Sequence, residues 1–133
     1  MHTKPVLSPA NARNIVDKAL MAAEDAGYSI SVAVVDDGGY LLAMQKTQNA
    51  GKLTAKVAIE KARTAALMRA PSAALQSRLR EDPALLRLTD YLPMAGGFPV
   101  MHDGECAGAV GISGGTAEQD TEIAEAALSA LEG

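Results

Sequence analysis

The stretch Gly108–Asp120, G-A-V-G-I-S-G-G-T-A-E-Q-D, decides the fold of this chain. Its first part is an apolar run that ends at Gly114 and Gly115, which is typical of a strand followed by a turn. Thr116 and Gln119 have the T-x-x-Q spacing of a capping box, in which two side chains satisfy backbone N–H groups at a helix start. The stretch therefore predicts a strand that leads directly into a C-terminal helix.

Two β-hairpins are predicted from turn signals that lie between apolar runs. The pair Asp103 and Gly104 joins strands expected over 98–102 and 105–113. The run Asp36–Gly39 joins a second pair, in which residues alternate with the period of two that strands require. The strands of that second pair are expected over 30–34 and 40–44.

Helices are predicted on either side of each hairpin. Ser8 caps the first helix, Pro9 occupies its first position and Gly27 ends it. A second helix is expected over 53–69, a segment without Gly or Pro that is rich in helix-forming residues. Shorter helices are expected from a Ser72 cap to Leu79 and from Asp82-Pro83 to Leu88, and a loop over 91–97.

The order of these elements predicts an α+β fold in which two hairpins build an antiparallel sheet flanked by helices. The chain has 133 residues, which is the length of one ordinary domain, so residues 1–133 are interpreted as a single unit. Apolar residues make up 48% of the sequence, enough to bury a core.

Charge and cysteine content narrow the classes of function. The formal net charge is -4 and no basic patch is evident, which argues against a nucleic-acid partner. A single cysteine, Cys106, rules out a disulfide within the chain and suits a cytoplasmic protein. No apolar run approaches the roughly 20 residues of a membrane span, and the first residues lack a signal-peptide pattern.

Four blocks in sequence order carry a resemblance to a known family: SVAVVDDGGYLLA at 31–43, KARTAA at 61–66, GGFPV at 96–100 and GECAGAVGISGGTAEQD at 104–120. Together they resemble the GlcG/HbpS family of haem-binding-type proteins, a module that also forms the C-terminal domain of some corrinoid adenosyltransferases. The resemblance implies a profilin-like fold and a homo-oligomer. It implies haem or a related ligand for some members, and a place in the breakdown of organic acids or aromatic compounds for others.

The glycines between strand and helix are candidate ligand-binding residues. Gly114 and Gly115 place N–H groups at a helix N-terminus, where the helix dipole favours an anion. If Gly96, Gly97 and Phe98 approach them, a pocket with an apolar wall and an N–H-rich floor results. The alternative is that the glycines only permit a tight turn and close packing.

Ser113 and the histidines are the candidates for nucleophilic or metal chemistry. Residues 111–115 match G-x-S-x-G, but Ser113 has no evident histidine and carboxylate behind it, so we expect it to bind ligand rather than attack it. His102 is a candidate axial ligand of haem iron, although a hairpin tip also holds ordinary exposed polar residues. His2 lies in a terminus expected to be loose.

Lys61 and Asp120 are the candidates for proton transfer. Lys61 belongs to the KARTAA block and could reach a ligand carboxylate, or could be solvated or salt-bridged instead. Asp120 would oppose an anion if it points into the site. The leading hypothesis is a protein that binds or processes a small acidic planar ligand, haem-like or an aromatic intermediate. The alternatives are a small catabolic enzyme, an isomerase or hydrolase acting on an organic acid, and a structural partner module without chemistry.

Overall fold

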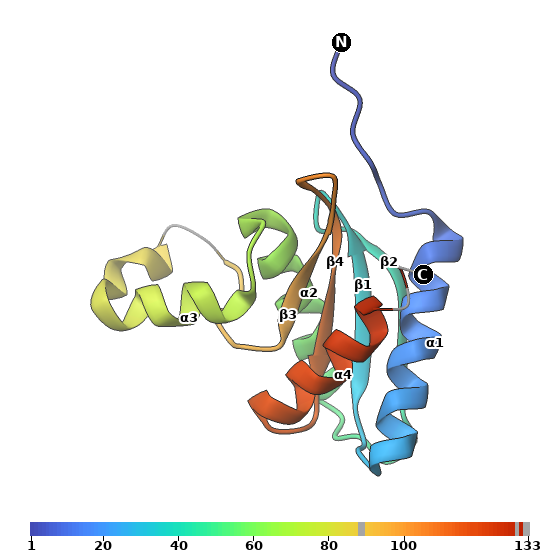
Figure 1. Ribbon diagram of the computed structural model, residues 1–133. Coiled ribbons are helices and arrows are strands. Elements are labelled where there is room, and N and C mark those ends of the chain that lie inside the picture. The colour runs from blue at the N-terminus through green and yellow to red at the C-terminus, as the bar shows by residue number, and fades with distance from the viewer. Residues whose placement is uncertain (88–89, 130, 132–133) are drawn as a thin grey trace.

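A four-stranded antiparallel sheet with the strand order β2-β1-β4-β3 is the framework of the protein (Figure 1). The computed structural model describes residues 1–87, 90–129 and 131. Its elements are α1 (Pro9–Ala26), β1 (Ser31–Asp36), β2 (Leu41–Lys46), α2 (Thr54–Met68), α3 (Ser72–Glu81), a 3-10 helix η1 (Pro83–Arg87), β3 (Gly97–His102), β4 (Glu105–Ser113) and α4 (Ala117–Ser129). The predicted α+β class and both predicted hairpins are confirmed.

Helix caps fix the ends of the first and last helices where the sequence predicts them. The Ser8 hydroxyl accepts a hydrogen bond from the Asn11 N–H at 3.0 Å, and Gly27 ends α1 with a φ of 77°. At α4, the Thr116 hydroxyl accepts from the Gln119 N–H at 3.1 Å while the Gln119 side chain accepts from the Thr116 N–H at 2.9 Å. Each capping box therefore satisfies two backbone N–H groups at the start of its helix.

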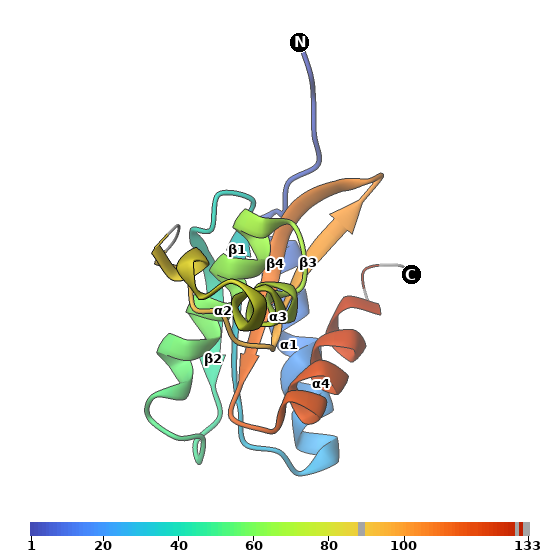
Figure 2. The same cartoon turned by 90° about the vertical axis from the view of Figure 1, so that its left-hand side faces the viewer.

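The helices cover the sheet on both faces. Helices α1 and α4 pack side by side on one face, and α2 packs on the other, as Figures 1 and 2 show. Alternate residues of β1 and β4 point to the two faces because side chains alternate along a strand. The main core, on the α1 and α4 face, consists of Leu7, Ala12, Ile15, Val16, Ala19, Ala23, Ile30, Val32, Val34, Val100, Ala107, Val110, Ile112, Ile123, Ala124 and Ala127.

The α2 face of the sheet is lined with small residues. A Cβ atom added to Gly111 of β4 would lie 2.0 Å from the Ala58 carbonyl oxygen of α2. One added to Gly97 of β3 would lie 2.1 Å from the Lys61 carbonyl oxygen. Helix α2 therefore rests on strand backbone at these two positions, a separation that no residue with a side chain permits.

The structure corrects the predicted role of Ser72. The residue at the cap of α3 is Pro71, which makes no side-chain capping bond, and Ser72 is the first residue of the helix. Its hydroxyl instead accepts a hydrogen bond from the Gly97 N–H at 2.8 Å, because the loop before β3 returns to the start of α3. The loop expected over 91–97 ends one residue earlier, because Gly97 is the first residue of β3.

Smaller differences concern the other boundaries. Helix α2 begins one residue after the predicted start and ends one before the predicted end. The helix expected after Asp82 is a 3-10 helix, and its expected last residue, Leu88, lies outside the described residues. Within the described residues, no helix is both long enough and apolar enough to cross a membrane.

The contact between α2 and the sheet gives a first prediction. Replacing Gly111 with alanine should lower the free energy of unfolding by about 1–3 kcal/mol, since the new methyl group overlaps backbone that cannot move independently. Gly51→Ala is the matched control, because its Cβ would meet only the Thr54 methyl group at an ordinary 3.7 Å. Urea denaturation of both variants checks this. Equal stabilities would show that α2 is not held against β4 as described.

Candidate functional site

Lys61 and Asp120, two of the predicted site residues, meet in the interior where β4 leads into α4. The Lys61 Nζ donates a hydrogen bond to the Ile112 carbonyl oxygen at 3.0 Å and lies 3.4 Å from Asp120 Oδ2. Both residues are buried, with 4% of Lys61 and 1% of Asp120 exposed. Of the two roles considered for Lys61, the structure places it in a buried ion pair.

Glycine at position 96 leaves room for this lysine. A Cβ atom at Gly96 would lie 2.7 Å from Lys61 Nζ, and the Gly96 φ of 125° disfavours any other residue. The Ile112 N–H donates to the Gly96 carbonyl at 2.9 Å, so the start of β3 is tied to the end of β4. Lys61 thus joins α2, on one face of the sheet, to α4 on the other.

The N–H groups at the start of α4 bind side chains of the same helix. The Gly115 N–H donates to Asp120 Oδ1 at 3.0 Å, and the Thr116 N–H donates to the Gln119 side chain. The anion at this helix N-terminus is therefore the chain's own carboxylate. Burial raises the pKa of Asp120 above its ordinary value, while the Lys61 ammonium and the Gly115 N–H act in the opposite direction.

The other predicted site residues near this junction, Ser113, Gly114 and Phe98, make structural contacts of their own. Ser113 is a buried residue at the end of β4, paired with Ser31 across the strands. Gly114 has a φ of 127°, and a Cβ there would lie 2.5 Å from the Ser29 carbonyl, so this turn requires glycine. Phe98 pairs with Val110 and packs against the main core. The structure thus brings Gly96, Gly97, Lys61, Gly115 and Asp120 together, around packed side chains.

His102 lies at the other end of the hairpin. It pairs with Glu105 at the start of β4, whereas Ser113 ends that strand, so the two are separated by the length of β4, roughly 25 Å at the rise of a strand. No triad involving Ser113 and His102 is therefore assembled in this chain.

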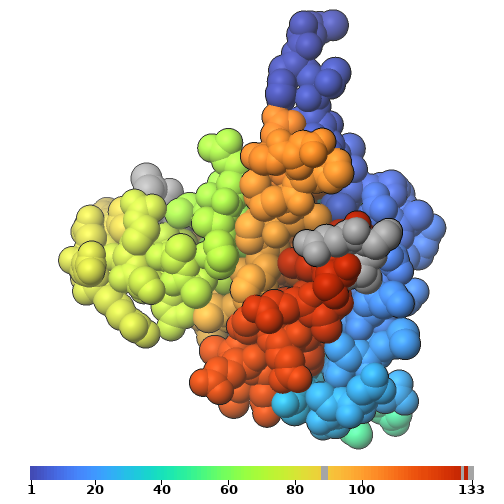
Figure 3. Space-filling view, viewed as in Figure 1, coloured from blue at the N-terminus to red at the C-terminus, as the bar shows by residue number. Residues whose placement is uncertain are grey.

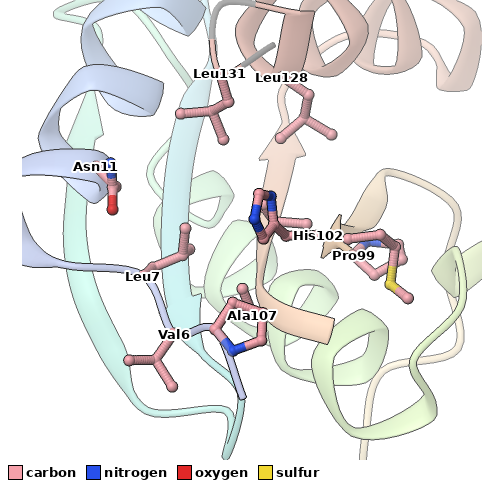
Figure 4. Close-up of a pocket in the computed structure, with 11 residues that line it drawn as sticks. Val6, Leu7, Asn11, Pro99, His102, Ala107, Leu128 and Leu131 are labelled. Carbon is pink, nitrogen blue, oxygen red and sulfur yellow. The ribbon is translucent and has the colours of Figure 1, made fainter. Parts of the chain in front are cut away.

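A cavity of about 780 Å³ opens beside His102 on the α1 and α4 face. Figure 4 shows the labelled side chains gathered around this space, with the His102 ring near the middle of the view. Its lining residues are Pro5, Val6, Leu7, Asn11, Pro99, Val100, Met101, His102, Ala107, Leu128 and Leu131. They come from the N-terminal segment, α1, the β3–β4 hairpin and the C-terminal end of the chain.

The His102 imidazole lies close to the carboxylate of the next residue, Asp103. Its Nε2 lies 3.4 Å from Asp103 Oδ2, and most of the side chain is exposed. Among the described residues, no group of three or more His, Cys, Asp or Glu side chains could hold a metal ion by itself.

Sequence reasoning missed the part that the N-terminal segment plays. The Leu7 N–H donates to the Ala107 carbonyl at 3.2 Å, and Leu7 and Ala12 are both buried in the main core. His2 bonds to Glu105, and Lys4 Nζ lies 2.9 Å from Asp37 Oδ2. An apolar residue just before the Ser8 cap with another four residues into the helix is a hydrophobic staple, a signal that could have shown this segment to be ordered.

A register shift in β3 also bears on the cavity. Four consecutive residues, 99–102, line it, although successive side chains of a regular strand point to opposite faces. The pairing of β3 with β4 shifts between Val100 and Met101. Such a bulge redirects side chains, and the sequence analysis did not predict it.

Comparison with known proteins identifies relatives over nearly the whole chain. A family model described as "Haem degrading protein HbpS-like" matches residues 7–129. Protein GlcG of Escherichia coli K12 is 37% identical over 114 residues, which is 85% of each protein. A double mutant of HbpS from Streptomyces reticuli has a similar crystal structure, with a TM-score of 0.91 and 32% identity over 98% of this chain and 90% of that one. The crystal structure of a PduOC:heme complex matches with a TM-score of 0.87 and 26% identity over 94% of each chain.

The buried carboxyl group predicts a pH dependence of stability. A raised pKa in the folded state means that the folded chain keeps the Asp120 proton to a higher pH than the unfolded chain does. The stabilisation is present below the ordinary aspartate pKa, about 3.9, and is lost as the pH rises through the folded pKa. The free energy of unfolding of the wild type, minus that of Asp120→Asn, should therefore fall as the pH rises from about 3 towards neutrality.

Urea denaturation of both proteins across that pH range measures this difference. Circular dichroism of Asp120→Asn at each pH confirms that the variant is folded. A difference that instead increases with pH would mean that attraction to Lys61 outweighs burial and holds the pKa of Asp120 below its ordinary value.

Proposed function

The chain belongs to the HbpS-like family, and we propose that it binds haem or a related planar, acidic ligand in the cavity beside His102. The observation that carries the proposal is the position of His102, the one imidazole among the described residues that line this cavity. The PduOC:heme complex, similar in fold over 94% of this chain, supports a tetrapyrrole as the ligand.

The cavity suits such a ligand in size and character. Its volume of about 780 Å³ lies in the range of roughly 300–1,000 Å³ that is usual for small-molecule sites. Most of its lining side chains are aliphatic, including Leu7, Leu128 and Leu131, which favours a large apolar ring system. Among them, only Asn11 and His102 carry side-chain polar groups.

His102 would hold the iron through its imidazole. A histidine that binds a metal commonly has a carboxylate beside its other ring nitrogen, which orients the ring. Asp103 occupies that position beside His102 Nε2. When bound, haem supplies the redox and ligand-binding chemistry of its iron; the chain supplies the imidazole and the apolar walls.

The remaining predicted site residues lie at the far end of the hairpin, and we propose that they support the cavity without lining it. Gly96 precedes β3, which begins with Gly97 and Phe98 and ends at His102. Ser113, Gly114 and Gly115 lead from β4 to α4, whose Leu128 lines the cavity. Lys61 and Asp120 fix the start of α4. We propose that these residues hold β3 and α4 in the positions from which His102 and Leu128 line the cavity. Association of copies of the chain into a homo-oligomer, which the resemblance implies, belongs to the same proposal.

The alternative, an enzyme acting on an organic acid, draws support from a different observation. A buried ammonium and a carboxylate of raised pKa, as in Lys61 and Asp120, are groups of the kind found at catalytic centres. Both are almost inaccessible, and neither lines the His102 cavity. A substrate would reach them only if the pair opened, so binding in the cavity is the function that the geometry supports better.

Haem titration tests the proposal. The wild-type chain should produce a Soret band that shifts and saturates at one haem per chain, because iron ligation by imidazole changes the haem spectrum. His102→Ala should weaken haem binding at least tenfold and change the position of the band. Asp103→Asn, a change at an exposed residue of the same hairpin, should retain the band and lose less affinity. Absence of any spectral change with the wild type, or an identical titration with His102→Ala, would contradict the assigned site.

A further inference from the structure

The described residues that line the His102 cavity carry few polar groups. Among the described residues that line it there is no Lys, Arg, Asp or Glu, and its only polar side chain besides that of His102 is Asn11. The Asn11 side-chain oxygen already accepts bonds from the Ser8 N–H at 3.1 Å and the Ser8 hydroxyl at 2.8 Å. The donor that Asn11 can offer a ligand is therefore its amide nitrogen.

Among the described residues, the lysine next in sequence to this lining is already in an ion pair. Lys4, adjacent to the lining segment 5–7, pairs with Asp37, while Lys61 lies at the far end of the hairpin and pairs with Asp120. The hairpin tip beside the cavity carries two carboxylates, Asp103 and Glu105, of which Glu105 bonds to His2. The charged side chains named here therefore offer no unpaired cation that would attract the carboxylate groups of a ligand.

Burying an ionised carboxylate without a cation or several hydrogen bonds is strongly unfavourable. A ligand with acidic groups can therefore enter this cavity only with those groups directed outward. Its binding must come from apolar area and from the bond to His102. A small organic acid, in which the carboxylate is most of the molecule, offers too little apolar area to do so.

We propose that the cavity selects amphipathic ring ligands by their apolar edge and leaves their carboxylates in water. This inference rests on the proposed function, since it concerns the same cavity. It specifies the ligand class further: a large planar body whose acidic groups lie on one side, held without an ionic contact to the described residues of the cavity.

Comparison of haem with haem dimethyl ester tests this directly, because the ester retains the ring and the iron but has no carboxylate. The dissociation constants of the two for the wild-type chain should agree within about threefold, and that for haem should change little between low and high salt. A loss of more than about tenfold for the ester would overturn the inference, because that is the size expected when a charge-assisted hydrogen bond is removed.

A variant that adds the missing cation gives a second readout. Val6 lines the cavity and is 60% exposed, so Val6→Lys places an ammonium at the opening without burying it. Val6→Gln, similar in bulk but uncharged, removes the same apolar side chain and is the reference. Relative to Val6→Gln, Val6→Lys should bind haem about three- to tenfold more tightly, and the two variants should bind the ester equally. Equal effects of Val6→Lys on both ligands would contradict outward-facing carboxylates.

The outcomes separate this inference from the function on which it rests. If haem and its ester bind equally and Val6→Lys tightens haem alone, both stand. If haem binds and the ester does not, the inference fails while the proposed function stands. If neither compound binds the wild-type chain, the proposed function fails and the inference fails with it.

Discussion

Direct contact between the backbone of α2 and the backbone of β3 and β4 is the constraint on which the rest of the structure depends. Gly97 and Gly111 create it, because a Cβ atom at either position would lie about 2 Å from a carbonyl oxygen of the helix. Alanines dominate the same face of the helix, at Ala58, Ala62 and Ala65. Because α2 packs so close to the sheet, the Lys61 side chain can extend past Gly96 to the start of α4, on the opposite face.

The two ends of the β3–β4 hairpin consequently have different characters. At the start of β3, close packing and the Lys61–Asp120 ion pair leave the predicted site residues buried and mutually bonded. At the hairpin tip, the strands extend beyond α2, and the N-terminal segment and α4 stand away from His102 around a cavity. The packed end therefore gives rigidity and the open end gives room for a ligand, which is how binding sites are commonly supported by a fixed framework.

Local signals in the sequence predicted the elements well, because caps, turns and periodicity act over a few residues. The Ser8 and Thr116 caps and the Asp103-Gly104 turn all belong to this class. The junction around Lys61 could not be located in this way, since a lysine within a charged stretch gives no sign that a glycine much later in the chain, Gly96, leaves space for its side chain. The Gly115 N–H was expected to be available to a ligand, but Asp120, five residues on, accepts its hydrogen bond. The cavity depends on the order of the N-terminal segment and on a bulge in β3, neither of which was predicted.

The most direct test of the central claim is a crystal structure of the chain with haem bound. The account predicts the porphyrin ring in the cavity between Leu7 and Leu128, a His102 nitrogen at roughly 2 Å from the iron, as for other metal-bound imidazoles, and both propionates in solvent. Haem bound at the Ser113–Gly115 end of β4, or held in the cavity with His102 turned away from the iron, would contradict it.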